Sequence, residues 1–329
     1  MKKILRLLRI GMFATAAALM ATPAAYAQEN ASLRLNWLYY GFHSFFPLGV
    51  EKGFYKDEGI NLAIGEGQGS GRAVQIVGAK SDTFGLSDGA SVIAGVTKGA
   101  PIVGVMGIMN KSPFAVIARA DSNIKTVKDL EGKTIAATTG EAGLTIFPAI
   151  VKANKLDGDS IKFVRVDGAA KLVAMLEKRV DAMLGGLENQ SLILAQRGLA
   201  VNNIAYSDVG ANTLGLVIHV NKETLEKNPK LVQGFVRATQ KAIAYTEKNP
   251  DEAIAALAKI KPDLDKALAM QQLKAGLALV RANGGESHPI GWMNPADWEA
   301  TLNMAREYQD LKTDLKAGDF YTETMVSAK

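Results

Sequence analysis

The feature that most constrains the fold is a regular alternation of short β-rich runs and helical runs, which begins at Ser32. Such alternation is typical of α/β layers built on mostly parallel sheets, because each parallel strand needs a crossover connection. The first part of the chain predicts five strands and three helices. We expect the strands at residues 33–37, 61–64, 83–86, 102–108 and 114–118, and the helices at residues 44–52, 71–79 and 90–98.

A second set of strands follows a polar, capped stretch at residues 122–130. These strands are expected at residues 134–137, 161–166, 182–184 and 204–206; a β-like run at 213–220 comes next, and then helices at 229–248, 250–259, 264–283 and 295–311. A chain that builds one sheet, crosses over to build another and then returns predicts two lobes joined by two crossing segments, near residues 118–123 and 212–219. We therefore expect lobe I to comprise residues 28–119 and 216–329, and lobe II residues 120–215.

The first 27 residues have the three parts of a secretory signal peptide. A positive segment with four Lys or Arg residues precedes an apolar run at residues 10–21, and Ala25-Tyr26-Ala27 supplies the small-x-small cleavage pattern. The apolar run is shorter than the ~20 residues needed to span a bilayer. We expect cleavage after about Ala27 and export to the periplasm.

Charge and cysteine content exclude several classes of function. Removing four basic residues and no acid from a chain with 38 basic and 33 acidic residues leaves a mature net charge of about +1, so the electrostatic signature of a nucleic-acid-binding protein is missing. The chain contains no cysteine, which excludes disulfides, zinc-thiolate sites, thiol catalysis and a lipid-anchored cysteine. These features favour a freely soluble periplasmic monomer.

Several motifs resemble one class of solute-binding proteins, that for nitrate, sulfonates, taurine and the pyrimidine precursor of thiamine. The motifs are Trp37 with His43, the run Gly-Phe-Tyr-Lys-Asp-Glu-Gly-Ile at 53–60, the glycine-rich segment at 67–71, and Asp-Leu-Glu-Gly-Lys at 129–133. The resemblance covers nearly the whole mature chain. It implies a periplasmic-binding-protein type II fold, with two mostly parallel sheets flanked by helices and joined by two hinge segments. It also implies partnership with the membrane permease subunits of an ABC importer.

Within that class, Trp37 and His43 are similar to the branch that binds the thiamine pyrimidine precursor, a branch that also contains synthases of that pyrimidine. The branch usually has an acid before the tryptophan and Pro-Asn after it, whereas here Asn36 precedes and Leu38-Tyr39-Tyr40 follows. The synthases carry a cysteine-rich segment, which this chain lacks. The resemblance therefore implies a binding protein rather than a synthase.

Four strand-to-helix turns, at residues 66–71, 87–91, 138–142 and 185–189, are candidate ligand contacts. Ligands of open α/β sheets bind at the carboxyl ends of strands, where helix N-termini present free N–H groups. The same polar side chains are also ordinary helix caps, and the two roles can coexist. Together with the aromatic loop and the histidine discussed next, they give the candidate ligand-binding residues: Trp37, Tyr39, Tyr40, His43, Gly69, Ser70, Asp88, Ser91, Thr138, Thr139, Gly140, Glu188 and Trp292.

An aromatic loop follows the first predicted strand. Trp37, Tyr39 and Tyr40 are placed to stack on a flat ring, although an apolar plug between the lobes is the alternative interpretation. His43 lies on the same loop and is either a ligand contact or structural. Trp292, in a later loop, is expected at the rim of the cleft.

The charges of the turns favour a neutral or cationic ligand with N–H donors, such as an aminopyrimidine. Four acids, Glu66, Asp88, Glu141 and Glu188, lie at the turns, against one basic residue, Arg72. A sulfonate or nitrate would be repelled unless backbone donors and Arg72 outweighed the acids. The alternative explanation is that the acids only complement the helix dipoles.

The sequence offers no nucleophile with a matching base and no metal-ligand spacing among its three histidines. The segment 67–71 lacks the third glycine of a dinucleotide fingerprint, so no cofactor is expected. We therefore predict a receptor that is not an enzyme and that binds a small heteroaromatic solute between its lobes. The alternatives are a receptor for an alkyl sulfonate, taurine or nitrate, and a periplasmic enzyme on the same fold.

The N-terminal segment generates a first test. Peptide mapping of the protein recovered from a periplasmic extract should find Gln28 at the start of the mature chain, because the cleavage pattern ends at Ala27. Recovery of peptides that contain the Met1 segment would show that this segment is not a cleaved leader.

Overall fold

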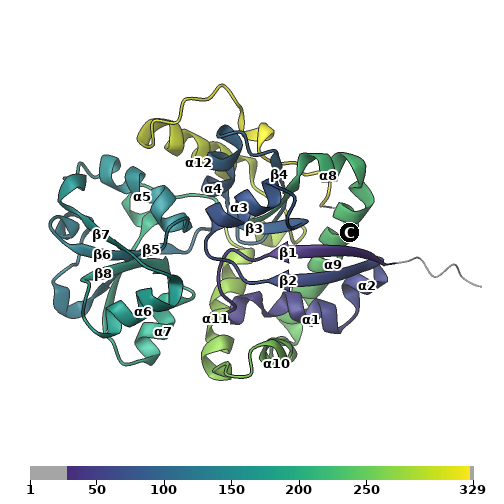
Figure 1. The fold of residues 1–329 in the computed structure, drawn as a ribbon, viewed down its shortest axis with the longest axis horizontal. Helices are drawn as coiled ribbons and strands as arrows, with labels where there is room; N and C mark the ends of the chain where they lie inside the picture. The colour runs from purple at the N-terminus through teal and green to yellow at the C-terminus, as the bar shows by residue number, and fades with distance from the viewer. Residues whose placement is uncertain (1–27, 327–329) are drawn as a thin grey trace, which may run out of the picture.

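Two five-stranded sheets form the framework of the protein (Figure 1). The computed structural model describes residues 28–326, so the predicted leader lies outside the described part of the chain. We call the first sheet with its helices lobe I and the second sheet with its helices lobe II. Within residues 28–326, no helix has both the length and the apolar character required to cross a membrane.

The sheet of lobe I has the strand order β2-β1-β3-β10-β4. Strands β1 and β2 pair in parallel, as do β1 and β3, whereas β10 runs antiparallel to both of its neighbours. The strand that returns from lobe II is therefore inserted between two strands of the first set. The bounds are β1 Glu29–Arg34, β2 Ile60–Gly65, β3 Phe84–Asp88, β4 Ile102–Gly107 and β10 Leu216–Asn221.

The sheet of lobe II has the order β7-β6-β8-β5-β9, with β5 antiparallel to both β8 and β9. The predicted strand at 114–118 is thus present as β5, but it belongs to lobe II and not to lobe I as expected. A sequence pattern identifies a strand without identifying its partners, which is why the boundary at residue 119 was misplaced. The bounds are β5 Phe114–Arg119, β6 Thr134–Ala137, β7 Lys162–Arg165, β8 Ala182–Gly186 and β9 Val201–Ala205.

Helices cover the sheets and begin where the sequence supplies caps. Asp88, Asp167 and Asp265 each accept a hydrogen bond from a backbone N–H in the first turn of the following helix, and proline occupies the first turn of α9, α10 and α12. The bounds are α1 Phe45–Glu51, α2 Phe54–Asp57, α3 Ser70–Gly78, α4 Gly89–Thr97, α5 Ala142–Ala153, α6 Gly168–Leu176, α7 Gln190–Gln196, α8 Lys222–Lys227, α9 Pro229–Lys248, α10 Pro250–Ile260, α11 Lys266–Val280 and α12 Pro295–Tyr308.

Two crossing segments, residues 108–113 and 210–215, connect the lobes side by side. The backbone N–H groups of Ile108 and Met109 both donate to the carbonyl of Leu216, at 2.7 and 2.9 Å. A Cβ added to Gly215 would lie 2.5 Å from the carbonyl oxygen of Met109, so glycine permits this close approach. The first crossing therefore precedes β5 and does not follow it.

Helix α12 packs on both lobes. Its residues Trp298 and Leu302 belong to an apolar cluster of lobe I, whereas Met304 belongs to the core of lobe II. Beyond its end, Gln309 donates to the carbonyl of Thr145 in α5, at 2.8 Å. The two lobes are thus held together by α12 as well as by the crossing segments (Figure 1).

The packing of the 3-10 helix Gly41–Ser44 against α11 can be tested directly, because the contact leaves no space for a side chain at Gly41. A Cβ at Gly41 would lie 1.8 Å from the carbonyl oxygen of Ala269. Gly41→Ala should therefore lower the free energy of unfolding, measured by chemical denaturation, by about 1–3 kcal/mol. Gly318→Ala is the control, since a Cβ added at Gly318 would meet nothing within 4 Å. Equal denaturation midpoints for the two variants would contradict this packing.

Candidate functional site

The lobes touch where two glycine-containing turns meet. The N–H of Gly71 donates to the carbonyl of Gly140 at 3.0 Å, and a Cβ at Gly69 would lie 2.5 Å from the same oxygen. Gly69 also has a φ of +118°, which glycine adopts without strain. Gly69 and Gly140, both predicted as ligand-binding, thus form a backbone contact between the lobes.

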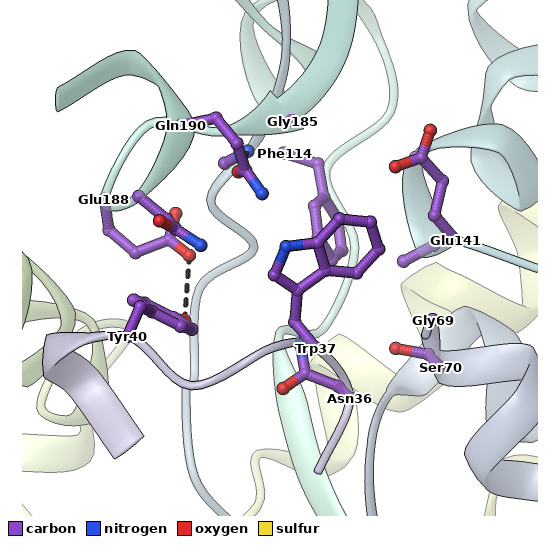
Figure 2. Close-up of a pocket in the computed structure, with 14 residues that line it drawn as sticks. Asn36, Trp37, Tyr40, Gly69, Ser70, Phe114, Glu141, Gly185, Glu188 and Gln190 are labelled. Atoms are coloured by element: carbon purple, nitrogen blue, oxygen red, sulfur yellow. Dashed lines mark hydrogen bonds between the residues drawn. The ribbon is translucent and has the colours of Figure 1, made fainter. Parts of the chain in front are cut away.

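A small cavity lies beside this contact and is lined by both lobes (Figure 2). Its volume is about 40 Å³, which has room for water but not for an aromatic ring. Five of the predicted residues line it: Trp37, Tyr40, Gly69, Ser70 and Glu188. The other lining residues were not named as individual ligand contacts, although five of them lie in the predicted turns at 138–142 and 185–189: Asn36, Phe114, Glu141, Ala142, Gly143, Gly185, Gly186, Asn189 and Gln190.

Trp37 occupies the centre of the junction. Backbone hydrogen bonds hold its loop against the loop after β2, because the N–H of Gly67 donates to the carbonyl of Trp37 at 3.0 Å and that of Gly69 to the carbonyl of Asn36 at 2.9 Å. A Cβ at Gly168 of lobe II would lie 2.7 Å from the indole, so the ring packs tightly on the start of α6. Figure 2 shows the indole projecting between the side chains of Tyr40 and Glu141.

A buried ion pair lies against the indole. The ammonium of Lys171 contacts the carboxylate of Glu141 and lies 4.7 Å from the centre of the Trp37 ring. Lys171 is 0 % exposed and Glu141 6 %. Burial raises the pKa of the Glu141 carboxyl, and the adjacent ammonium opposes that rise. The sequence analysis missed Lys171, because a single lysine in an apolar helix carries no local signal of a buried partner.

Tyr40 of lobe I and Glu188 of lobe II meet at the cleft, by which we mean the junction between the lobes. The Tyr40 hydroxyl donates to Oε1 of Glu188 at 3.1 Å, while Oε2 of Glu188 has no hydrogen-bond partner among the described residues. Burial raises the pKa of Glu188 to about 7. This carboxyl therefore exchanges its proton near neutral pH, and it can either donate a hydrogen bond or accept one.

Ser70, Asp88 and Ser91 form a fully buried cap beneath the cavity. The N–H of Ser91 donates to Asp88 at 3.0 Å, and the N–H of Asp88 donates to the Ser70 hydroxyl at 3.2 Å. Burial raises the pKa of Asp88, and these local hydrogen bonds oppose the rise. Ser70 lines the cavity, whereas Asp88 and Ser91 do not, so the latter two act as capping groups in this arrangement.

Three predicted residues lie elsewhere. The Tyr39 hydroxyl donates to the carbonyl of Ile64 at 3.1 Å, outside the small cavity. His43 is 0 % exposed with a 3.0 Å contact to the side chain of Asn36, and burial lowers its pKa to about 3, so it is a neutral structural residue. Trp292 does not reach the cleft, because its ring stacks on His288 at 3.8 Å.

The four acids counted in the sequence are not equivalent in the structure. Glu66 accepts from the N–H of Tyr39 at 2.9 Å and pairs with Lys261, Glu141 pairs with Lys171, and Asp88 is an internal cap. Glu188 alone lines the cavity without a cation among the described residues. The excess of negative charge is therefore smaller than the count of turn residues predicts. One titrating carboxyl remains.

Two larger cavities flank Trp37 on the outer sides of the junction. One, of about 570 Å³, is lined by Thr138, Thr139 and the end of β7, and the other, of about 630 Å³, by Tyr39, Tyr40 and α7. Trp37 lines all three cavities.

Within residues 28–326, no group of three or more His, Cys, Asp or Glu side chains is placed to hold a metal ion.

Comparison with known proteins places these features in context. A family model described as NMT1/THI5 like matches residues 42–253. A 4-amino-5-hydroxymethyl-2-methylpyrimidine phosphate synthase of Legionella pneumophila is 28% identical over 242 residues, which cover 72% of this chain and 75% of that protein. The riboflavin-binding protein RibY of Chloroflexus aurantiacus is 26% identical over 322 residues, which cover 94% and 91%.

Among solved structures, the alkanesulfonate-binding protein SsuA of Xanthomonas axonopodis pv. citri superposes with a TM-score of 0.68 at 17% identity, over 91% of this chain and 100% of that one. This likeness shows the fold, and the predicted two-sheet periplasmic-binding-protein architecture is confirmed.

The prediction that the chain is not an enzyme is overturned by these relatives. The pyrimidine phosphate synthase is named as an enzyme, and it matches most of this chain. The missing cysteine-rich segment and the missing nucleophile-base pair were therefore insufficient grounds for excluding catalysis.

The raised pKa of Glu188 generates a stability test. The ordinary pKa of a glutamate carboxyl is about 4.5, and the pKa of Glu188 in the folded protein is about 7. Between these two pH values the folded protein holds a proton that the unfolded chain has released, so the free energy of unfolding falls as the pH rises. Glu188→Gln keeps the uncharged form at every pH. Relative to wild type, its free energy of unfolding should increase by about 1.4 kcal/mol per pH unit between pH 5 and 7.

The control is Glu299→Gln, which changes an exposed carboxyl on α12 and should follow the wild-type pH profile. Parallel profiles for wild type and Glu188→Gln from pH 5 to 7 would show that Glu188 is ionised throughout that range in the folded protein.

Proposed function

The chain belongs to the NMT1/THI5-like family, and from this premise we propose that it is the periplasmic receptor of an ABC importer that binds a small nitrogen-containing heteroaromatic solute between its lobes. The observation that carries the proposal is the pairing of aromatic faces with one titrating carboxyl. Trp37, Tyr40 and Phe114 surround the cavity, and Oε2 of Glu188 lacks a partner among the described residues.

This combination suits a ring with nitrogen atoms at its edge. Aromatic faces stack on flat rings whatever their substituents, whereas a carboxyl of pKa about 7 can donate to a ring nitrogen or accept from an amino group. The relatives support this class, because the names of two of them refer to a pyrimidine and to riboflavin.

Binding of such a solute in the small cavity requires the lobes to separate. The cavity of about 40 Å³ is smaller than any aromatic ring, and the contact between Gly71 and Gly140 closes it. We propose that the lobes open about the two crossing segments, residues 108–113 and 210–215, admit the solute and close on it. The membrane permease subunits of the importer would receive the solute from the closed form, and the receptor would act as a monomer.

A second candidate function is conversion of the same kind of ring, which the name of the Legionella pneumophila relative favours. Mass spectrometry separates the two candidates, since a receptor returns its solute unchanged after prolonged incubation and an enzyme returns a product.

The solute class is tested by two substitutions that remove different contacts. With the ring compound that gives the largest thermal shift in a screen, Trp37→Ala should weaken binding by roughly 1 to 3 kcal/mol, because stacking is lost. At a pH above 7, where Glu188 is ionised, Glu188→Gln should weaken it by up to about 1.5 to 3 kcal/mol, because a neutral amide replaces a charged acceptor. Both changes in binding free energy are to be measured by isothermal titration calorimetry.

Matched controls are Trp292→Ala, which removes a tryptophan outside the cleft, and Glu299→Gln; both should leave the affinity unchanged. A sulfonate or nitrate receptor predicts the opposite sign at Glu188, because removal of a nearby negative charge relieves repulsion of an anion. Tighter binding in Glu188→Gln together with a neutral Trp37→Ala would contradict the heteroaromatic proposal.

A further inference from the structure

The cavity of about 570 Å³ lies next to Trp37 and is lined by both lobes. Leu38, Gly67 and Gln68 line it from lobe I, and Thr138, Thr139 and residues 165–169 line it from lobe II. This volume falls within the range of about 300–1,000 Å³ that is usual for pockets that hold drug-sized ligands. A single six-membered ring against Trp37 would leave most of it unfilled.

Thr138, which lines this cavity, has a buried hydroxyl without a hydrogen-bond partner among the described residues. The residue is 7 % exposed. Buried polar groups in folded proteins are almost always hydrogen-bonded, and this oxygen is enclosed in the closed arrangement of the lobes, so a ligand group or water can reach it only when the lobes separate. A hydroxyl can both donate and accept, and its partner can therefore be of either kind.

Arg165 and Asp167 bring opposite charges to the same cavity without pairing with each other. Arg165 ends β7 and lies with its guanidinium carbon 5.0 Å from the centre of the Phe163 ring. Asp167 caps α6 by accepting the N–H of Ala170 at 2.7 Å through Oδ1. Within residues 28–326, neither side chain forms a salt bridge. The cavity thus presents a strong donor and a strong acceptor on two exposed residues, and the hydroxyl of Thr138 joins them when the lobes separate.

This set of groups selects a neutral hydroxylated chain over an anion. A phosphate or carboxylate would gain from Arg165 but would be repelled by Asp167. Each hydroxyl of a polyol donates one hydrogen bond and accepts others, so neighbouring hydroxyls can satisfy Asp167, Arg165 and Thr138 at the same time.

We propose that this cavity, which we call the tail subsite, binds a polyhydroxylated substituent carried by the heteroaromatic solute. The inference rests on the proposed function, because it takes the ring to lie against Trp37. Trp37 lines both the small cavity and the tail subsite, so a ring held there can extend its substituent towards Arg165 and Asp167.

The test uses three probes that share one ring system: lumichrome, which lacks a polyol chain, riboflavin, which carries one, and riboflavin 5′-phosphate. Calorimetry on the full-length mature protein should show riboflavin binding at least about tenfold more tightly than lumichrome, roughly the effect of one additional net hydrogen bond. The phosphate should bind no more tightly than riboflavin, because of Asp167.

Substitutions then assign the effect to the tail subsite. Asp167→Asn retains a residue that caps helices well, and Arg165→Gln retains a polar chain; each should reduce the ratio of riboflavin to lumichrome affinity while leaving lumichrome affinity unchanged. Asp159→Asn and Lys162→Gln, exposed neighbours that do not line the cavity, should leave the ratio unchanged.

Equal affinities for riboflavin and lumichrome, or a ratio unaffected by both subsite variants, would overturn the tail subsite while leaving ring binding intact. Tighter binding of the phosphate than of riboflavin would also overturn it, in favour of an anion subsite. Binding of 4-amino-5-hydroxymethyl-2-methylpyrimidine without any binding of riboflavin would overturn it and leave the proposed function standing. Failure of every ring probe to bind would remove the proposed function itself.

Discussion

The arrangement of the cleft depends on the buried ion pair of Lys171 and Glu141 beneath the indole of Trp37. An ammonium can remain in a protein interior only when a partner charge and a suitable surface replace its water. Glu141 supplies the charge from lobe II, and Trp37 supplies a ring face from lobe I. The pair therefore fixes the indole at the lobe junction, where it separates a small closed cavity from two larger ones.

The same pair determines the electrostatics that a solute meets. Because Lys171 neutralises Glu141 and Lys261 lies beside Glu66, the carboxyl of Glu188 is the unpaired acid at the small cavity within the described residues. Its pKa of about 7 follows from burial and not from a neighbouring acid. The cleft thus combines aromatic faces with one group of adjustable protonation, which is the chemistry that nitrogen heterocycles require.

Much of this arrangement follows from the sequence, and the failures have physical causes. Turns after parallel strands converge because those strands end at one sheet edge, so Ser70 and Glu188 line the small cavity with Trp37 and Tyr40, and Thr138 lines the larger cavity beside Trp37. The placement of β5 was wrong because strand pairing depends on distant residues. Lys171 was missed for the same reason, since its partners come from other elements. His43 and Trp292 fit the motif pattern, but local packing on Asn36 and His288 takes them out of the cleft.

The central claim is that a heteroaromatic ring is the natural occupant of the cleft. Mass spectrometry of the small molecules released by denaturing the protein, after purification under native conditions from the cells that produce it, tests this directly. The account predicts release of a nitrogen-containing aromatic compound in amounts comparable to the protein. Release of an alkyl sulfonate, taurine or nitrate, with no ring compound, would contradict it.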